Sequence, residues 1–195
     1  MSKKGNNTIS VLFIILIIFI MIGFLGISIF KSGQTSKYFS KEDSSVAQPL
    51  YDKIMSLTED NYPKTPEEVV SLYTDGYKLL YGDKIKDLSI VPNILEKQRL
   101  LFSEQLIAQN GLEEQTTAVL NNIENLKQNK VKITNITIKD TNYTNKNNTE
   151  ATVKVVNQDN LFQIYYYIYY LEMEADQWKI TGWYNTDENY NIITN

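Results

Sequence analysis

The chain has 195 residues and a formal net charge of −4, with no cysteine and no histidine. It therefore has no disulfides, no thiol nucleophile, none of the usual zinc or iron ligands and no imidazole base. Residues 32–195 carry 16 basic against 23 acidic groups, and this net charge of −7 argues against a nucleic-acid partner.

An uncharged apolar segment covers residues 9–30 and ends at Lys31. As a helix, its 22 residues would extend about 33 Å, enough to cross a hydrocarbon core of about 30 Å. We therefore predict a single transmembrane helix over 9–30 that contacts the lipid bilayer. The alternative is a cleaved signal peptide, whose apolar region usually has about 7–15 residues.

The orientation of this helix follows from the short tail before it. Lysines flank both ends of the segment, so the positive-inside count is nearly a tie. A tail of residues 1–8 is most simply left in the cytoplasm, which predicts a cell-membrane protein with its C-terminal domain outside the membrane. Residues 31–49 are polar and are predicted to form a juxtamembrane linker.

Helices are predicted next along the chain. A short one covers Leu50–Leu57, and a better signal follows at Thr65, where Pro66 and Glu68 complete an N-cap and a capping box. This second helix is predicted to run to about Tyr81 and to stop at Gly82.

Two further helices are predicted before the strands. One begins at Pro92 and continues to Asn110-Gly111, because apolar residues recur at helical spacing through Leu101, Phe102 and Leu106. The other runs from Leu112 to about Gln128.

The remaining third of the chain reads as four strands joined by short turns. Three of these strands cover Val131–Lys139, Ala151–Val155 and Trp178–Trp183. A bulge is predicted near Thr134-Asn135 in the first of them, and a bend at Gly182 in the last. The fourth is the aromatic run Leu161–Met173, which is bulky on both faces and is therefore predicted to lie at the centre of the sheet. Helices followed by an antiparallel meander predict the α+β class.

This order resembles the NTF2-like superfamily, in which helices pack in the concave side of a curved four-stranded antiparallel sheet. More narrowly, the capping motif at 62–73, Asn110-Gly111 and the Trp178-Lys179-Ile180-x-Gly182-Trp183 strand look like a family of uncharacterised proteins of Gram-positive anaerobic bacteria, which pair one membrane helix with a domain of unknown function. The resemblance implies an NTF2-like domain of three to four helices and four strands over residues 50–187, with 188–195 as a tail.

No catalytic residue, metal ligand or cofactor is predicted. Enzymes of the fold that the chain resembles usually hold a histidine in the cone, and this sequence has none. Glu172, Glu174 and Asp176 could supply oxygen ligands to a hard cation, but a solvated strand end explains them more simply. Tyrosine and tryptophan combine apolar area with a polar group, so we name a candidate pocket or interface, with core packing as its alternative: Tyr165, Tyr167, Tyr169, Trp178 and Trp183.

We therefore expect a single-span membrane protein whose extracytoplasmic domain binds a protein partner or a small ligand without catalysis, or associates with itself through the sheet. One alternative is an assembly subunit that resembles the bitopic NTF2-like scaffold of bacterial secretion and conjugation machines. The other is a surface-anchored hydrolase or isomerase, which would need a buried carboxylate with a raised pKa.

Overall fold

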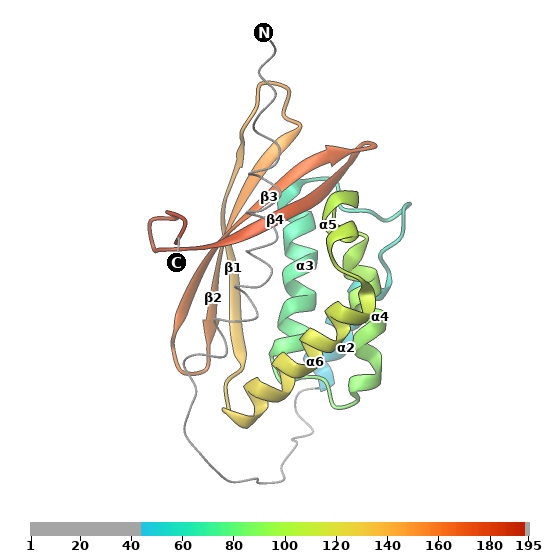
Figure 1. Cartoon of the computed structure of the whole chain (residues 1–195), viewed down its shortest axis with the longest axis vertical. Helices are drawn as coiled ribbons and strands as arrows, with labels where there is room; N and C mark the ends of the chain where they lie inside the picture. The colour runs from blue at the N-terminus through green and yellow to red at the C-terminus, as the bar shows by residue number, and fades with distance from the viewer. Residues whose placement is uncertain (1–43, 194–195) are drawn as a thin grey trace. The chain divides into compact units, whose positions relative to one another are not determined.

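The computed structural model describes residues 44–193 (Figure 1). The transmembrane helix predicted over 9–30 lies outside the described residues. Within 44–193, no helix is both long enough and apolar enough to cross a bilayer. The described part is an α+β fold of helices followed by a four-stranded antiparallel sheet, as the sequence pattern predicts.

The capping box predicted at Thr65 is present. α3 (Pro66–Tyr81) begins where the Thr65 hydroxyl accepts a hydrogen bond from the backbone N–H of Glu68 at 3.2 Å. In return, the Glu68 carboxylate accepts from the backbone N–H of Thr65, also at 3.2 Å. Both bonds satisfy donors that the first turn of a helix leaves unpaired, so the start of α3 is fixed by its own sequence.

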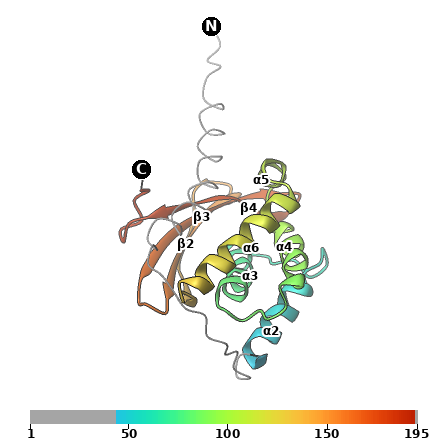
Figure 2. The ribbon, with the colours of Figure 1, turned by 60° about the horizontal axis from the view of Figure 1, so that its bottom comes forward.

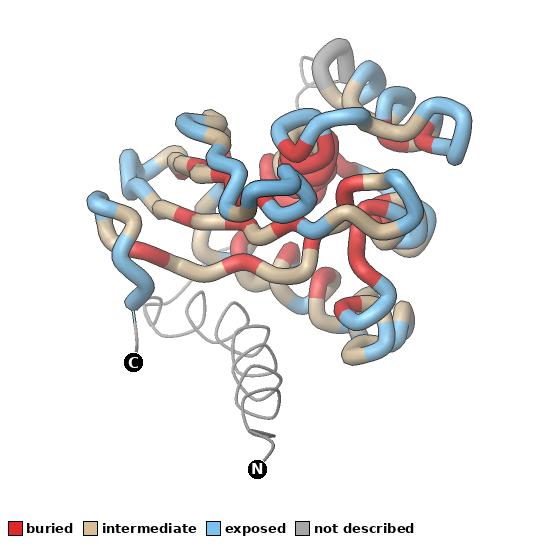
Figure 3. Tube along the Cα trace, turned by 90° about the horizontal axis from the view of Figure 1, so that it is seen from above, coloured by how far each residue is buried: buried red, intermediate tan, exposed pale blue. Residues whose placement is uncertain are grey.

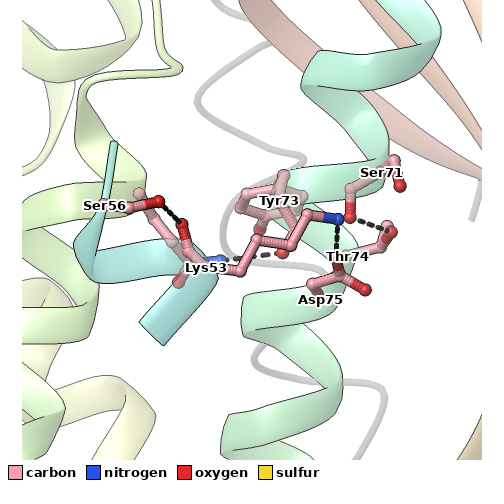
Figure 4. A network of polar contacts seen from close by, with 7 residues as sticks. Lys53, Ser56, Ser71, Tyr73, Thr74 and Asp75 are labelled. Carbon is pink, nitrogen blue, oxygen red and sulfur yellow. Dashed lines mark hydrogen bonds and ion pairs between the residues drawn. The ribbon is translucent and has the colours of Figure 1, made fainter. Parts of the chain in front are cut away.

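The linker predicted over 31–49 is wrong for its last residues. α2 (Ser44–Met55) begins at Ser44 and not at Leu50, and Pro49 lies inside it. Serine and proline are weak helix formers, so the sequence pattern conceals this start. α2 is joined to α3 by an ion pair between Lys53 and Asp75, and Figure 4 shows this pair beside short-range bonds of both helices.

The single helix predicted from Pro92 to Asn110 is divided in two. A short 3-10 turn, η2 (Leu88–Ile90), leads into α4 (Val91–Arg99), and α5 (Glu104–Gln109) follows after a break. In the break, Leu101 accepts a backbone hydrogen bond from Ile180 at 2.8 Å, and Ser103 donates one to Ile180 at 2.9 Å. The Ser103 hydroxyl then caps α5. The helix ends because this backbone pairs with the sheet. α6 (Leu112–Gln128) follows as predicted.

The sheet is a simple meander in the order β1-β2-β3-β4. Its strands are β1 (Ile133–Tyr143), β2 (Glu150–Asp159), β3 (Ile164–Glu174) and β4 (Gln177–Thr186). The aromatic strand β3 is central, as predicted, although Leu161 and Phe162 lie in the turn before it. The bulge predicted near Thr134-Asn135 is present, a second one follows Ile138, and a third lies at Thr181, next to Gly182 on β4.

The helices cover one face of the sheet, with α3 against it (Figure 2). Buried and partly exposed residues alternate along β2 to β4, so each strand has an inner face toward the helices and an outer face (Figure 3). The sheet bends enough that Tyr143 of the first strand contacts Trp178 of the last, with ring centroids 5.8 Å apart. The core therefore lies between α3 and the inner face.

A glycine in α3 makes room for a buried glutamine of α4. A Cβ at Gly76 would lie 2.7 Å from Cδ of Gln98, which is 3% exposed and donates to the Tyr73 carbonyl at 2.8 Å. We expect Gly76→Ala to lower the free energy of unfolding by about 1–2 kcal/mol, because the lost buried hydrogen bond outweighs alanine's better helix propensity. Urea denaturation measures this change.

The same substitution in a Gln98→Ala background should have the opposite sign. With the amide gone, only the helix propensity remains, and Gly76→Ala should then raise the free energy of unfolding by up to about 1 kcal/mol. The same effect of Gly76→Ala in both backgrounds would show that the two residues do not interact.

Candidate functional site

Six tyrosines face one another between α3 and β3, and we call them the tyrosine cluster. α3 contributes one every fourth residue, which places them on one helix face, and β3 contributes every second residue on its inner face. The members are Tyr73, Tyr77, Tyr81, Tyr165, Tyr167 and Tyr169. The tyrosines of one face of α3 and those of the inner face of β3 therefore form one layer of rings.

The rings of this layer pack against one another at edge or tilted angles. The centroid of Tyr73 lies 5.8 Å from that of Tyr169, 5.6 Å from that of Trp183 and 5.5 Å from that of Phe102. Tyr169 and Trp183 are also neighbours, at 5.9 Å. Such pairs add about 0.5–1.5 kcal/mol each beyond the area they bury, so these four rings form the centre of the core.

Burial shifts the acid–base properties of the cluster. Loss of water raises the pKa of Tyr81 to about 12 and raises the pKa values of Tyr73, Tyr77 and Tyr169 as well. Burial also raises the pKa of Tyr167, against the opposing effect of a hydrogen bond with Tyr77. All of these phenols are therefore protonated at neutral pH, so none of them is a general base there.

Four of the five residues named from the sequence are buried. Tyr167, Tyr169, Trp178 and Trp183 are 2–8% exposed. Tyr165 is only partly buried, and its hydroxyl lies 3.1 Å from Oδ2 of Asp159 and 2.8 Å from Oε1 of Gln163. The four buried rings give a protein partner almost no accessible area, and a ligand-binding role for them stays a prediction.

Some buried polar atoms beside the tyrosine cluster have no hydrogen-bond partner. Among residues 44–193 these include Oδ1 of Asn157, Oδ1 of Asn185 and Nε1 of Trp183. Asn157 is paired with Tyr165 in the sheet register, Asn185 with Tyr167 and Trp183 with Tyr169. Buried polar groups normally find a partner, because an unpaired one costs about 1–3 kcal/mol. One side of the cluster can therefore accept and donate further hydrogen bonds.

The other side of the sheet carries a second aromatic group, which we call the outer aromatic face. Its residues are all partly exposed and come from the two last strands: Tyr166, Ile168, Tyr170 and Tyr184. Tyr170 and Tyr184 contact each other edge to face, at 5.4 Å between centroids. The helices lie on the opposite face, so they do not cover these side chains (Figure 2).

The C-terminal segment after β4 reaches one end of the outer aromatic face. The ring of Tyr190 meets Tyr166 edge to face at 5.8 Å, and the Lys154 ammonium lies 4.9 Å from the Tyr190 centroid. Ile192 forms a backbone bridge to Thr186. The predicted tail at 188–195 is therefore, through residue 193, part of the folded unit.

The acidic residues at the start of the last hairpin do not gather into a metal site. Within 44–193 there is no group of three or more acidic side chains arranged to hold a cation. Glu172 is paired with Glu150 across the strands, and partial burial together with the charges of Glu150 and Glu174 raises its pKa. Glu174 accepts a hydrogen bond from the backbone N–H of Glu104 at 3.3 Å, which ties α5 to this hairpin.

The model of one protein family, a domain of unknown function (DUF6715), matches residues 1–183. The chain belongs to the DUF6715 family. This confirms the expected membership of an uncharacterised family. No curated protein matches the chain, and no solved structure matches it.

Two asparagines of this DUF6715 domain are not among the residues predicted from the sequence. Asn157 and Asn185 lie on the inner face because they continue the alternation of Val153, Val155 and Trp183, and that alternation could have identified them. The outer aromatic face was visible as the second bulky side of the aromatic strand. The sequence could not tell which side the helices cover.

Proposed function

We propose that this protein is a membrane-anchored assembly protein with no catalytic role. Residues 9–30 cross the cell membrane, the N-terminal tail stays in the cytoplasm, and the folded part is an extracytoplasmic NTF2-like domain. The helices packed on one face of a bent antiparallel meander support the NTF2-like assignment. The fold does not supply the function, which has to be argued from surfaces.

The observation that carries the proposal is the outer aromatic face. Three bulky side chains on the central strand and Tyr184 beside them are left partly exposed on the side away from the helices. A contiguous aromatic surface that stays partly exposed is typical of protein contacts, whose centres are enriched in tyrosine. Asp159, a buried carboxylate at the end of β2, accepts hydrogen bonds from the turn that follows it, which leaves no reason to assign hydrolysis to it.

The partner we assign to this face is a second copy of the chain. On β3, Tyr166 and Tyr170 are placed symmetrically on either side of Ile168. A two-fold axis at Ile168 would set Tyr166 of one copy against Tyr170 of the other, and such self-complementarity is what an isologous dimer needs. Two copies in one membrane also meet at a raised effective concentration.

Ile168→Glu tests this proposal, because it places two carboxylates at the axis of the dimer. In the monomer, Lys154 lies opposite Ile168 in the register, so the new charge has a cation beside it. We expect the dimer of the full chain in detergent to weaken by at least about thirtyfold. Light scattering across a concentration series measures its mass.

Asn121→Glu is the matched control, since it adds the same charge to an exposed position of α6. It should leave the dimer unchanged. A wild-type chain that is monomeric at every concentration would contradict the proposal, as would an Ile168→Glu dimer as tight as the wild type.

A second candidate function is the binding of a small neutral molecule beside the tyrosine cluster. The unpaired oxygens of Asn157 and Asn185 and the unpaired Trp183 N–H favour it. These groups carry no charge, and the surrounding rings suit a ligand that has both apolar faces and hydrogen-bonding groups. This candidate requires the inner face to open, since each of these atoms is buried.

A further inference from the structure

The hairpin between β2 and β3 ends in exposed apolar side chains. Leu161 is 55% exposed, Phe162 is 82% exposed and Ile164 is 51% exposed. We call these three residues the apolar tip. A single exposed leucine needs no explanation, but three large apolar side chains together on the tip of a hairpin point to a contact.

The backbone of the tip is held in place by Asp159, two residues before Leu161. Oδ1 of Asp159 accepts from the backbone N–H of Leu161 at 2.8 Å and from that of Gln163 at 2.9 Å. Phe162 has a φ of 63°, in the left-handed region where glycine or asparagine is the usual residue. A bulky residue that is both strained and almost fully exposed does not stabilise the fold, and this favours a role in binding.

Two lysines lie beside the apolar tip. The amide of Asn160 donates to the Lys130 carbonyl at 3.0 Å and accepts from the Lys132 backbone N–H at 2.7 Å, which ties the turn after α6 to the hairpin. Both lysines are exposed. Apolar side chains flanked by cations are the pattern that binds the surface of an anionic bilayer, where the rings enter the headgroup region and the ammonium groups meet phosphates.

The chain arrives at this end of the domain. The start of α2, at Ser44, and the β2–β3 hairpin both lie toward the lower end in Figure 1. Thirteen residues separate residue 30 from Ser44, and they span at most about 50 Å. A domain tethered so closely meets the bilayer at a high effective concentration, so a weak contact suffices.

We propose that the apolar tip enters the headgroup region of an anionic bilayer, with Lys130 and Lys132 against the lipid phosphates. The inference rests on the proposed anchor at residues 9–30, which would hold the chain to the same bilayer. It assigns a second membrane contact to the folded domain itself. A hydrophobic pocket on another protein is the competing partner, and the test below separates the two.

The chain has no cysteine, so one introduced cysteine can carry an environment-sensitive fluorophore. Leu161→Cys places it on the apolar tip, and Asn147→Cys places it on the exposed turn of the β1–β2 hairpin as a control. The labelled full chain is reconstituted in phosphatidylcholine vesicles with or without phosphatidylglycerol. With the anionic lipid, quenching by a lipid-borne quencher should be about threefold greater or more at the tip than at the control.

Substitutions at the tip should remove the signal. Phe162→Asp and the double variant Lys130→Gln with Lys132→Gln should each bring the quenching of the Leu161→Cys label close to that of the control. Equal quenching at both label positions in both kinds of vesicle would overturn the inference, and a protein pocket would then become the better partner.

Flotation of the vesicles reports on the anchor independently. If the chain floats with both lipid mixtures while its tip label stays in water, the result supports the anchor and overturns the tip contact. Flotation with anionic vesicles only, reversed by high salt, supports the tip contact and overturns the anchor. A chain that floats with neither mixture overturns both.

Discussion

Replacing Tyr169 by alanine is expected to lower the free energy of unfolding by about 3–5 kcal/mol, the range seen when a buried aromatic ring is deleted. Tyr169 is 2% exposed and its ring meets those of Tyr73, Tyr167 and Trp183. The cavity would lie at the centre of the core, where the neighbouring rings have little freedom to collapse. Urea or thermal denaturation of the purified chain measures the loss.

Tyr170→Ala is the matched control, because it deletes the same side chain one residue along the same strand. Tyr170 lies on the outer aromatic face and is partly exposed, so its loss should cost less than about 1–1.5 kcal/mol. Equal losses of stability in the two variants would contradict the distinction between the inner and outer faces of β3, and a larger loss for Tyr170→Ala would reverse it. If dimers form as proposed, Tyr170→Ala should weaken them while Tyr169→Ala destabilises the fold.

Local signals allowed much of this fold to be predicted from the sequence. The capping box at Thr65 and Glu68 needs only residues within one turn, and the strands follow from alternation and turn residues close in the chain. The central position of β3 follows from its two bulky faces. Each of these predictions depends on neighbours in sequence, and each is confirmed.

The prediction of one helix from Pro92 to Asn110 failed because of a distant neighbour. Leu101 and Phe102 continue a helical pattern, but Ile180, far away in the chain, pairs with this backbone and interrupts the helix. Ser103 was the local sign of a new helix start, and the apolar spacing around it concealed that sign. The candidate site has the same limit, since alternation finds both faces of β3 but only the position of α3 decides which face is covered.

The tyrosine cluster also determines how the domain should respond to alkali. In the unfolded chain a tyrosine has a pKa of 10.0, whereas burial raises the pKa of Tyr81 to about 12 and raises those of Tyr73, Tyr77, Tyr167 and Tyr169 as well. Below pH 10 both states keep these protons, so the stabilising effect is complete. As the pH rises above 10, only the unfolded chain loses them, and the folded state becomes less stable.

The size of this effect makes it the strongest pH dependence expected of the domain. Each buried tyrosine lowers the free energy of unfolding by about 1.4 kcal/mol per pH unit between its unfolded and folded pKa values. Five such groups together can remove a typical stability of about 5–15 kcal/mol within one to two pH units. We therefore expect cooperative unfolding between pH 10 and 12. Tyrosinate absorbance at 295 nm and far-ultraviolet circular dichroism, recorded on the same samples, measure the ionisation and the unfolding.

Tyr169→Phe separates this ionisation from packing, since it removes one hydroxyl and keeps the ring. Above pH 10, the free energy of unfolding of the variant should fall less steeply with pH than that of the wild type. The difference in slope is the contribution of one tyrosine, about 1.4 kcal/mol per pH unit. Because the ring and its contacts with Tyr73, Tyr167 and Trp183 are kept, its stability at pH 7 should stay close to that of the wild type. If all tyrosines titrated near pH 10 while the circular dichroism stayed unchanged, water would have to reach the cluster in the folded state. The unpaired polar groups of Asn157, Asn185 and Trp183 would then be accessible to a ligand in the folded state, which would support the binding of a small molecule there.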